Sequence, residues 1–469
     1  MYVAGQWVGG PRSQPVINPY DGSVVDTVPL AGPDEVERAL ASAERGARVM
    51  RRLGGYQRST ILQKAARLLE QRAEQFAATI TLEEGKTIRE ARAEVVRAVE
   101  VLALSAEEAK RLAGETVPLD GAPGVTQQFG FTIRVPCGIV VAISPFNFPL
   151  ILVAHKVGPA LAAGNSVILK PATDTPLSAL RLVEVLLEAG LPAEAIQCVI
   201  GSGREIGEPL CADRRVRKIT FTGSRDVGER ICRVAGIKKV TMELGSNSPV
   251  VVMPDADLEE VAGAIAATGY SNAGQVCISA QRIIGLRPIY GDLIEALKPR
   301  VAAITTGDPL DEHTMMGPMV KESEAKRVEI WVQEAVAGGA RLVLGGERQG
   351  AIFAPTAVAD VSPRMRISCE ELFGPAVALT PVDTIDEALA LTNNSHYGLS
   401  AAIFTKNIEW AMRYAKEADA GNIHINWGPQ WRADLMPYGG LKDSGFGKEG
   451  PRYAVAEMTE LKMVVMHLK

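Results

Sequence analysis

The feature that most constrains the fold is a change of sequence rhythm near residue 137. Residues 34–112 are mostly helical in pattern, as in 60–75 and 87–111, which are rich in Ala, Leu, Glu and Arg. Further on, apolar runs alternate with helical stretches such as 176–189 and 226–234, and the runs read CGIVVAIS, SVILKP, AIQCVIG, KITFTG and KKVTMELG. Buried strands separated by helices are typical of a parallel, doubly wound α/β sheet with helices on both faces.

A second series of strands and helices follows between residues 248 and 427. The runs SPVVVM, QRIIGL, AAIFT and GNIHIN predict its strands, and 258–270 and 386–394 predict two of its helices. Two α/β units in one chain leave a cleft between them, and such folds bind ligands at the carboxyl ends of their strands. The length of 469 residues agrees with more than one packed unit.

Two stretches fall outside this alternation. Residues 114–135 form an extended excursion, and the tail 457–469, EMTELKMVVMHLK, ends in a strand-like run. Isolated strands need a partner to pair with, so we expect the two stretches to form an oligomerisation arm.

Composition and charge exclude several classes of protein. The formal charge of −5 comes from 50 basic and 55 acidic residues without blocks, which leaves no footprint for nucleic acid or for a polybasic membrane segment. Six cysteines without a CxxC pair indicate a reduced, cytoplasmic protein, and five scattered histidines show no metal-binding spacing. The N-terminus lacks the features of a signal peptide, and polar residues interrupt the most apolar stretch, 150–169, so we expect no membrane span.

Cys277 is the candidate nucleophile. It lies in GQVCIS, directly after a Gly-containing turn, and an exposed turn suits a reactive thiol. The alternative for any such cysteine is a small buried hydrophobe, which we expect of the other five: Cys137, Cys198, Cys211, Cys232 and Cys369.

Two polar residues could assist this thiol. Glu243 ends the strand KKVTMELG, where poor solvation raises the pKa of a carboxylate toward that of a general base; the alternative is a strand-end salt bridge. Asn147 lies between two prolines in SPFNFP, which hold its amide rigid so that it can face a developing oxyanion. The alternative for Asn147 is an Asx-turn or a helix cap.

Two glycine-rich turns are candidates for binding a cofactor phosphate. FTGSRDVG, residues 221–228, joins a strand to a helix and offers backbone N–H groups and the Ser224 hydroxyl to a pyrophosphate. GSGREIG, residues 201–207, also follows a strand, but its spacing differs from the dinucleotide fingerprint. Lys170, which closes the strand SVILKP, could bind a ribose hydroxyl. The alternatives are plain loops and a solvated lysine.

Seven segments, taken in order, resemble the aldehyde dehydrogenase superfamily and span nearly the whole chain: SPFNFP, LKPATDTP, FTGS, MELGS, GQVCIS, EELFGP and MPYGGLKDSGFGKEG. The resemblance implies a Rossmann-like cofactor domain, a second α/β catalytic domain and a β-strand arm. We assign 1–113 and 136–243 to the first, 244–445 to the second, and 114–135 and 455–469 to the arm. Members usually assemble through this arm, so we expect a homodimer or homotetramer.

The resemblance also implies a role for each matching residue. Cys277 would be the nucleophile, Glu243 the general base, and Asn147 with the Cys277 backbone N–H the oxyanion hole. Lys156 and Glu449 match a proton relay to the base. Hydride transfer to NAD or NADP and hydrolysis of a cysteine thioester would give the carboxylic acid. The cofactor contacts would come from Ser144, Phe146, Lys170, Thr173, Gly203, Gly207, Gly223, Ser224, Leu244, Glu371 and Phe373.

Three positions depart from the family pattern. Phe146 stands where a tryptophan or tyrosine is usual, and Ser246 replaces a glycine that follows the general base. Thr173 stands where NAD-preferring members commonly carry a glutamate, so a 2′-phosphate is not repelled. Arg204 could pair with that phosphate, with a solvated surface arginine as the alternative. We therefore expect NADP to be accepted.

The stretch NWGPQWRADLMPYGG borders the substrate entrance by the same resemblance. Arg432 lies at about the position where members that oxidise phosphorylated or carboxylated aldehydes carry an arginine, and His155 would face the same tunnel. This favours a short, polar, anionic or hydroxylated aldehyde, such as a semialdehyde, lactaldehyde or glyceraldehyde 3-phosphate. The alternative is that Arg432 pairs with Asp434 or a neighbouring subunit and that His155 only packs.

Two other functions stay open at this point. A thioester-forming relative would pass the acyl group to CoA, but a general base such as Glu243 favours hydrolysis. A protein that kept the fold and lost activity is opposed by the intact set Cys277, Glu243, Asn147 and Glu371.

Overall fold

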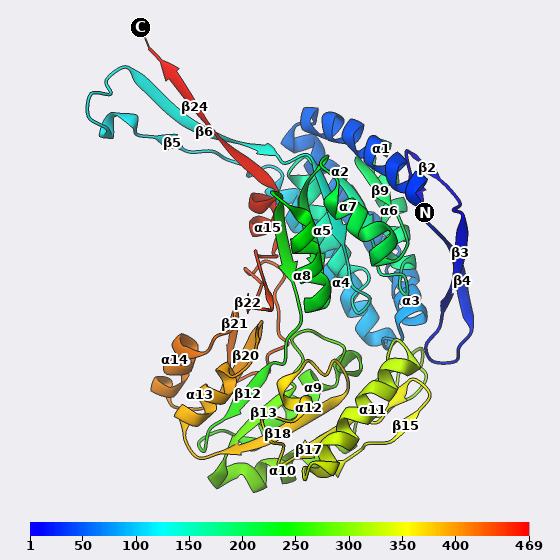
Figure 1. Cartoon of the computed structure of the whole chain (residues 1–469), viewed down its shortest axis with the longest axis vertical. Helices are drawn as coiled ribbons and strands as arrows, with labels where there is room; N and C mark the ends of the chain where they lie inside the picture. Colours follow the sequence, from blue (N-terminus) through cyan, green and yellow to red (C-terminus); the bar gives the residue numbers. More distant parts are fainter. Residues whose placement is uncertain (469) are drawn as a thin grey trace.

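Two α/β lobes and a projecting arm make up the computed structural model, which describes residues 1–468 (Figure 1). The lobe drawn mostly in blue to green holds one large sheet, and the lobe drawn in green to orange holds the other. The predicted fold class, α/β with parallel sheets and helices on both faces, is confirmed.

The sheet of the first lobe has eight strands in the order β2-β1-β9-β8-β7-β10-β11-β23. The strands from β9 to β11 pair in parallel, whereas β1 and β23 pair antiparallel with their neighbours. Strands β7 and β8 are buried along their whole length, which explains their continuous apolar runs. The strand bounds are β1 (Tyr2–Val3), β2 (Gln6–Trp7), β7 (Ile139–Ile143), β8 (Ser166–Lys170), β9 (Ile196–Cys198), β10 (Val216–Thr222), β11 (Lys239–Glu243) and β23 (Gly445–Phe446).

Helices cover both faces of this sheet. Gly85, with φ +92°, ends α3 in the left-handed region, and the Thr87 side chain accepts the Glu90 backbone N–H to begin α4. The predicted helix over 60–75 differs from the structure, because the chain breaks at Arg72 between α2 and α3. The helices are α1 (Pro33–Arg52), α2 (Gly55–Gln71), α3 (Ala73–Glu84), α4 (Ile88–Glu108), α5 (Ile151–Ala162), α6 (Leu177–Glu188), α7 (Glu208–Ala212), α8 (Arg225–Ala235) and α15 (Pro451–Glu457).

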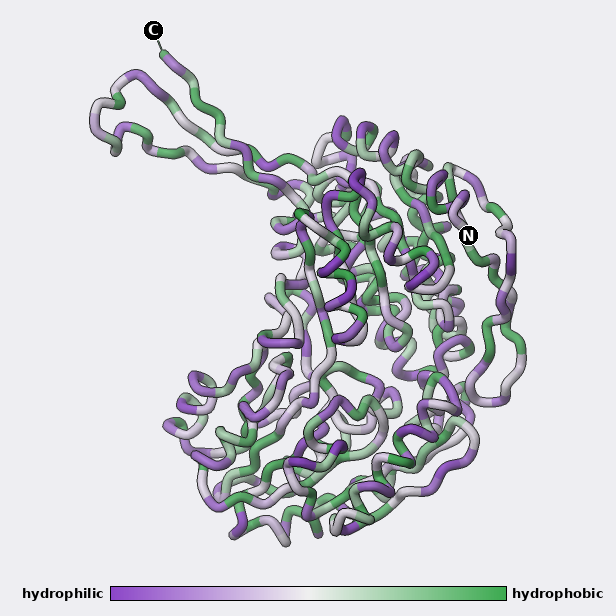
Figure 2. Tube along the Cα trace, in the orientation of Figure 1, coloured by the Kyte–Doolittle hydropathy of each residue, from purple (hydrophilic) through white to green (hydrophobic). Residues whose placement is uncertain are grey.

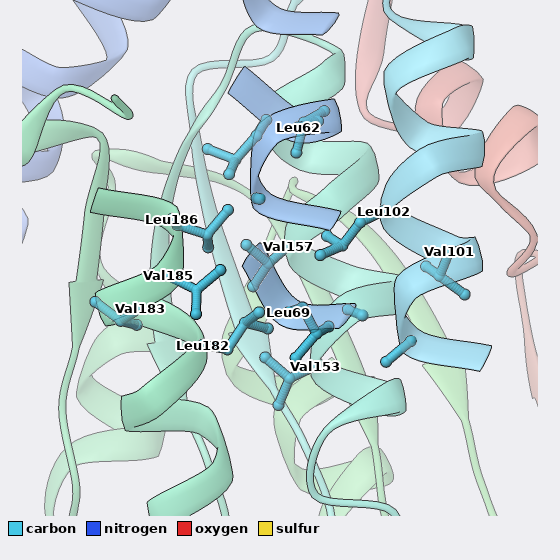
Figure 3. Close-up of a cluster of buried hydrophobic side chains, with 14 of the residues drawn as sticks. Leu62, Leu69, Val101, Leu102, Val153, Val157, Leu182, Val183, Val185 and Leu186 are labelled. Atoms are coloured by element: carbon cyan, nitrogen blue, oxygen red, sulfur yellow. The ribbon is translucent and has the colours of Figure 1, made fainter. Parts of the chain in front are cut away.

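The apolar core between α2, α4, α5 and α6 holds this lobe together. Figure 3 shows Leu62 and Leu69 of α2 facing Leu102 of α4, Val157 of α5 and Leu186 of α6. Each fully buried side chain of this kind stabilises the fold by about 1.5–3 kcal/mol relative to exposure. The packing fixes α5, whose N-terminus follows directly on the segment that carries Asn147.

The second lobe contains a seven-stranded sheet in the order β14-β17-β18-β13-β12-β20-β21. All neighbours pair in parallel except β14 and β17. Its strands are β12 (Pro249–Val252), β13 (Arg282–Leu286), β14 (Arg341–Leu344), β17 (Thr356–Ala359), β18 (Ala376–Val382), β20 (Ser400–Phe404) and β21 (Asn422–Ile425). Its helices are α9 (Leu258–Gly269), α10 (Arg287–Ala302), α11 (Glu322–Ala337), α12 (Arg366–Cys369), α13 (Ile385–Asn393) and α14 (Ile408–Glu417).

The arm is a three-stranded sheet formed by β5 (Thr116–Val117), β6 (Gln128–Pro136) and β24 (Thr459–His467). The two stretches that we expected to need a partner pair with each other, since β6 and β24 run antiparallel over their full lengths. Apolar and polar residues alternate along the arm (Figure 2), and several apolar side chains on it are exposed, among them Phe129, Ile133, Leu461, Met463 and Val465.

The N-terminal strands were not predicted. Besides β1 and β2, the hairpin of β3 (Arg12–Ile17) and β4 (Val24–Leu30) lies along the first lobe (Figure 1). Strands β1 and β2 span two residues each, too few for an alternating pattern to appear. Within residues 1–468, no helix is long and apolar enough to cross a bilayer.

Candidate active site

Cys277 lies on the loop between α9 and β13, just after a tight turn. Asn272 and Ala273 of this turn have φ of +49° and +52°, a conformation that residues with a Cβ rarely adopt. Gly274 follows with φ +67°, and a Cβ there would overlap the Gly374 carbonyl. The strained turn therefore fixes where the thiol is presented.

Two cavities meet at Cys277. The smaller one, of about 200 Å³, is lined by Glu243 and Tyr438 among others, and the larger one, of about 880 Å³, by Asn147 and Glu371. Both cavities share Leu152, Thr222, Leu244 and Cys277. Cys277, which is partly exposed as a residue, thus borders two separate cavities, as a group that reacts with one ligand beside another requires.

Asn147 lines the larger cavity, and hydrogen bonds fix both its side-chain amide and its backbone carbonyl. Its side-chain Nδ2 donates to the Gln275 carbonyl at 2.7 Å, close to the thiol along the chain. Its own carbonyl accepts from Lys86 Nζ at 2.8 Å and from Asn272 Nδ2 at 3.1 Å. The amide therefore has a fixed position with one N–H left for another acceptor.

Glu243 is a buried carboxyl group without a hydrogen-bond partner in the described part of the chain. Strand β11 ends at this residue, next to Gly445 of β23, and its side chain lines the smaller cavity. Burial, followed by the nearby charge of Glu449, raises the pKa of Glu243 well above the usual range. A carboxylate with a raised pKa is a stronger base than an ordinary glutamate, which suits a general base.

Lys156 and Glu449 form a buried ion pair beside Glu243. Lys156 Nζ donates to Glu449 Oε1 at 3.0 Å and to Thr222 Oγ1 at 2.6 Å. Arg432 Nη1 donates to the other oxygen of Glu449 at 3.1 Å. Burial opposes the charge on Glu449, but Lys156 and Arg432 outweigh it and lower the pKa of this carboxyl to about 2.

The thiol of Cys277 contacts a phenol. Its Sγ lies 3.2 Å from Oη of Tyr438, and the Tyr438 ring lies under the Arg432 guanidinium, whose central carbon is 3.9 Å from the ring centroid. Burial raises the pKa of the thiol to about 12, the Tyr438 hydrogen bond lowers it, and the carboxyls of Glu243 and Glu371 raise it.

His155 and Arg432, the two predicted substrate residues, lie side by side on the smaller cavity. Arg432 Nη2 is 3.1 Å from His155 Nε2, and that nitrogen is 3.0 Å from Asp434 Oδ1. Arg97 of α4 makes a two-pronged contact with Asp434, at 2.7 and 3.0 Å. Arg432 is closer to Glu449 than to Asp434, 3.1 against 3.9 Å. The alternative pairing of Arg432 with Asp434 is thus the weaker of its two contacts.

The predicted cofactor residues line the larger cavity with one exception. Thr173 does not contribute to this lining; it lies just beyond Ala172, which does, and its carbonyl accepts a hydrogen bond from Gln14. The remaining ten all contribute: Ser144, Phe146, Lys170, Gly203, Gly207, Gly223, Ser224, Leu244, Glu371 and Phe373.

This cavity has the chemistry of a nucleotide site. Ser224 begins α8 at the end of β10, so backbone N–H groups face the cavity where an anion would bind. Burial lowers the pKa of Lys170 to about 8 and raises that of Glu371 to about 7. Glu371 accepts the Ser246 N–H at 2.8 Å, and a Cβ on Gly245 would overlap its carboxylate. Gly245 therefore allows the backbone and the Glu371 carboxylate to approach closely.

Sequence reasoning missed several residues that shape the site. The motif MPYGGLKDSGFGKEG contains Tyr438 but does not mark it as a contact of the thiol, and Arg97 and Lys86 lie outside every motif. The expectation that all other cysteines are buried was wrong for Cys232 and Cys369, which are partly exposed. Among residues 1–468, no group of three His, Cys, Asp or Glu side chains could hold a metal ion.

A model described as the aldehyde dehydrogenase family matches residues 7–464. A 3-sulfolactaldehyde dehydrogenase from Priestia aryabhattai is 47% identical over 468 residues, which cover 100% of this chain and 98% of that protein.

Solved structures are similar over nearly the whole length. Aldehyde dehydrogenase 21 from Physcomitrella patens, in complex with the reaction product succinate, is 40% identical with a TM-score of 0.96, covering 99% of this chain and 97% of that one. Glyceraldehyde-3-phosphate dehydrogenase from Methanocaldococcus jannaschii, complexed with NADP, is 35% identical with a TM-score of 0.94, covering 97% and 100%.

Proposed function

The chain belongs to the aldehyde dehydrogenase family, and from this premise we propose that it acts on a short, polar aldehyde that carries an anionic or hydroxyl group. It is an oxidoreductase that oxidises aldehydes to carboxylic acids. The resemblance that the motifs indicated is thereby confirmed.

The observation that carries the substrate proposal is the buried guanidinium of Arg432. Its side chain is 7% exposed, and its Nε has no hydrogen-bond partner within residues 1–468. A purely alkyl substrate would leave this donor desolvated and unpaired, which is costly, whereas an oxygen-rich substrate would satisfy it. The cavity of about 200 Å³ favours a substrate of few atoms.

Three cations line this cavity, Lys86, Arg97 and Arg432, together with the carboxyl groups of Glu90, Glu94, Glu243 and Glu449. The preference for an anion therefore rests on the Nε of Arg432, which is unpaired within residues 1–468, and not on the net charge of the lining. Burial, and then the charge of Arg432, lowers the pKa of His155, so the histidine adds no stable positive charge. Two of the similar proteins are named for short, oxygenated anionic aldehydes, 3-sulfolactaldehyde and glyceraldehyde 3-phosphate.

We also propose a nicotinamide cofactor in the larger cavity, where it would accept a hydride from the aldehyde carbon. Ser144 Oγ is buried there without a partner among the described residues, which fits a site that a ligand completes. Ser224 and the N-terminus of α8 would hold the pyrophosphate, Lys170 and Glu371 the ribose hydroxyls, and Phe373 would pack near the ring. The volume of about 880 Å³ accommodates a dinucleotide.

NADP acceptance remains part of this proposal. Arg204 lines the cavity, is exposed and has no ion-pair partner within residues 1–468, so it is free to meet a 2′-phosphate. The structure from Methanocaldococcus jannaschii, which resembles this chain, holds NADP.

The proposed mechanism uses the residues around the thiol. The Cys277 thiol gives up its proton through Glu243 to Lys156 and Glu449, and the thiolate then attacks the aldehyde carbon. The free N–H of Asn147 together with the Cys277 backbone N–H holds the oxyanion of the thiohemiacetal. Loss of hydride leaves a thioester on Cys277. Glu243 then takes a proton from water, which hydrolyses the thioester, and Lys156 with Glu449 passes that proton on.

Assembly and location complete the proposal. The exposed apolar side chains of β6 and β24 support an oligomerisation arm made of 114–135 and 455–469 that joins copies into a homodimer or homotetramer. The first sheet supports 1–113 and 136–243 as the cofactor domain, and the second supports 244–445 as the catalytic domain.

Six cysteines without a CxxC pair support a cytoplasmic location.

The proposal is tested with a panel of short aldehydes against NAD and NADP, with kcat/KM for every pair. The panel holds chain length constant and varies the far group among sulfonate, phosphate, carboxylate, hydroxyl and methyl. We expect the oxygenated aldehydes to be oxidised best and the acid to form without CoA. Better catalysis with long alkyl aldehydes would contradict the substrate class, and a strict need for CoA would contradict hydrolysis.

A further inference from the structure

Tyr438 is the polar group nearest to the reacting sulfur on the side of the smaller cavity. The apolar side chains of Phe148, Val276 and Ile278 pack around Cys277. Glu243 and Arg432 also line this cavity, but no hydrogen bond joins either of them to the sulfur within residues 1–468. Tyr438 is 3% exposed, and the described residues offer its hydroxyl one partner, Cys277 Sγ at 3.2 Å. Burying a phenol hydroxyl costs free energy unless it is hydrogen-bonded, so a buried tyrosine hydroxyl needs a partner.

The oxyanion is not the group that Tyr438 faces. Asn147, which would bind the oxyanion, lines the larger cavity only, whereas Tyr438 lines the smaller cavity only. The two side chains therefore approach the sulfur from different sides. When the aldehyde carbon bonds to Sγ, its oxygen points to Asn147 and the rest of the substrate extends past Tyr438.

The bond to the substrate changes what Tyr438 can pair with. Before reaction the sulfur is a thiol or thiolate, which exchanges a hydrogen bond with the phenol. In the adduct the sulfur has two carbon neighbours and no proton, and it becomes a weak acceptor. The buried phenol then needs another oxygen nearby, and the carbon next to the reacting one lies within its reach.

We propose that the Tyr438 hydroxyl donates a hydrogen bond to a hydroxyl on the second carbon of the substrate, so that the enzyme selects 2-hydroxyaldehydes. The assignment rests on the proposed function and narrows it, because a simple semialdehyde carries no oxygen at this position. Arg432, stacked on the same ring, keeps the phenol in place and lies beside the path to the far end of the substrate.

The test compares lactaldehyde with propanal, which differ by the 2-hydroxyl, in the unmodified enzyme and in Tyr438→Phe. The readout is the ratio of their kcat/KM values, because any effect of the substitution on the thiol itself applies to both aldehydes and cancels. We expect the ratio to fall about tenfold, the size of one net hydrogen bond. The preference between the two enantiomers of lactaldehyde should shrink in parallel.

Tyr414→Phe is the matched control. Tyr414 is also fully buried, and its hydroxyl pairs with Thr392 Oγ1 in the second lobe, away from both cavities. Its loss should leave the ratio unchanged. An unchanged ratio in an active Tyr438→Phe enzyme would overturn the assignment, whereas failure of the unmodified enzyme to oxidise any aldehyde would overturn the proposed function instead.

A second measurement needs no variant and decides the question if Tyr438→Phe does not fold. The unmodified enzyme is given lactaldehyde and 3-hydroxypropanal, which carry the same hydroxyl on neighbouring carbons. Recognition by Tyr438 predicts a preference for the 2-hydroxyl of about tenfold or more. Equal or better catalysis with 3-hydroxypropanal would overturn the proposal.

Discussion

Glu243 and Glu449 lie in the same buried cluster but hold their protons very differently. Burial and the charge of Glu449 raise the pKa of Glu243 well above the usual range, whereas Lys156 and Arg432 lower the pKa of Glu449 to about 2. Both carboxyls line the smaller cavity. Two carboxyls with separated pKa values suit different tasks: Glu243 can take up and hold a proton, whereas Glu449 stays ionised and carries a proton only in passing, with Lys156.

This relationship predicts the pH dependence of deacylation. Glu243 must lose its proton to act as a base, so kcat falls on the acid side as pH drops through its pKa. In Glu449→Gln, the like charge disappears and Lys156 and Arg432 are no longer neutralised. Both changes favour the ionised form of Glu243, so we expect the acid limb of the kcat profile to move to lower pH. A limb that stays in place would show that another group controls it; Glu417→Gln, in an exposed pair with Arg413, is the control.

The covalent step is tested by removing the nucleophile and the base separately. Cys277→Ala should abolish dehydrogenase activity while cofactor still binds, measured by fluorescence titration. Glu243→Gln should release a burst of reduced cofactor in stopped flow and then turn over about 10²–10⁴-fold more slowly, because acylation survives and deacylation stalls. Normal steady-state turnover in Glu243→Gln would remove the base assignment.

The buried pair Lys86–Glu94 should matter more for stability than any surface pair. Lys86 Nζ donates to Glu94 at 2.6 Å with both side chains 1% exposed, and Glu94 also accepts the Leu150 and Ile151 N–H groups that begin α5. Lys86→Met leaves a buried carboxylate without its cation, which destabilises by about 3–5 kcal/mol.

Thermal unfolding measures this loss. The double variant Lys86→Met/Glu94→Gln should recover part of the lost melting temperature, because it removes the uncompensated charge. Lys298→Met, which breaks an exposed pair with Glu295, should cost about 1 kcal/mol or less. Equal losses from Lys86→Met and Lys298→Met would contradict the role of burial.

Much of the fold could be predicted because parallel strands buried on both faces leave continuous apolar runs. Strands β7, β8 and β10 lie where those runs stand in the sequence. The N-terminal strands could not be predicted, because two-residue strands such as β1 show no period. The break at Arg72 escaped too, since the helical pattern continues across it.

Part of the candidate site could likewise be predicted from the sequence, and part could not. Motifs located Cys277, Glu243 and Asn147, and the structure brings these three to the junction of two cavities. Tyr438 was not predicted, because a tyrosine in a glycine turn has no local signal, and the sulfur it contacts is 161 positions away. Arg97 reads as one more charged residue on a helix, and its partner Asp434 is 337 positions away. Contacts between residues so far apart in the sequence leave no trace in a local sequence pattern, so they could not be predicted from it.

We expect Arg204 to decide how well NADP is accepted. An exposed guanidinium that meets a 2′-phosphate contributes roughly 1.5 kcal/mol, so Arg204→Ala should raise KM for NADP about tenfold and change KM for NAD little. Arg233→Ala, on the same helix α8 but outside the cavity lining, is the control. An unmodified enzyme that prefers NAD by more than roughly a hundredfold in kcat/KM, about 2.7 kcal/mol, would contradict NADP acceptance.

We expect Arg432 to set the preference for a charged substrate, and two effects, both of which lower activity, decide the expected result of Arg432→Leu. Loss of the guanidinium removes a charge-assisted hydrogen bond to an anionic substrate in a desolvated pocket, which costs on the order of 1.5–3 kcal/mol, or about 10–100-fold in KM. It also releases Glu449 from one of its two cations and Tyr438 from its stacked partner, which affects every substrate. We therefore expect kcat/KM for propanal to fall several-fold less than kcat/KM for a carboxylated or sulfonated aldehyde.

Arg432→Lys keeps the positive charge without the planar guanidinium, so its kcat/KM for the anionic aldehyde should lie between those of the unmodified enzyme and Arg432→Leu. Equal losses for the charged and the neutral aldehyde would mean that Arg432 acts only by holding Glu449 and Tyr438 in place.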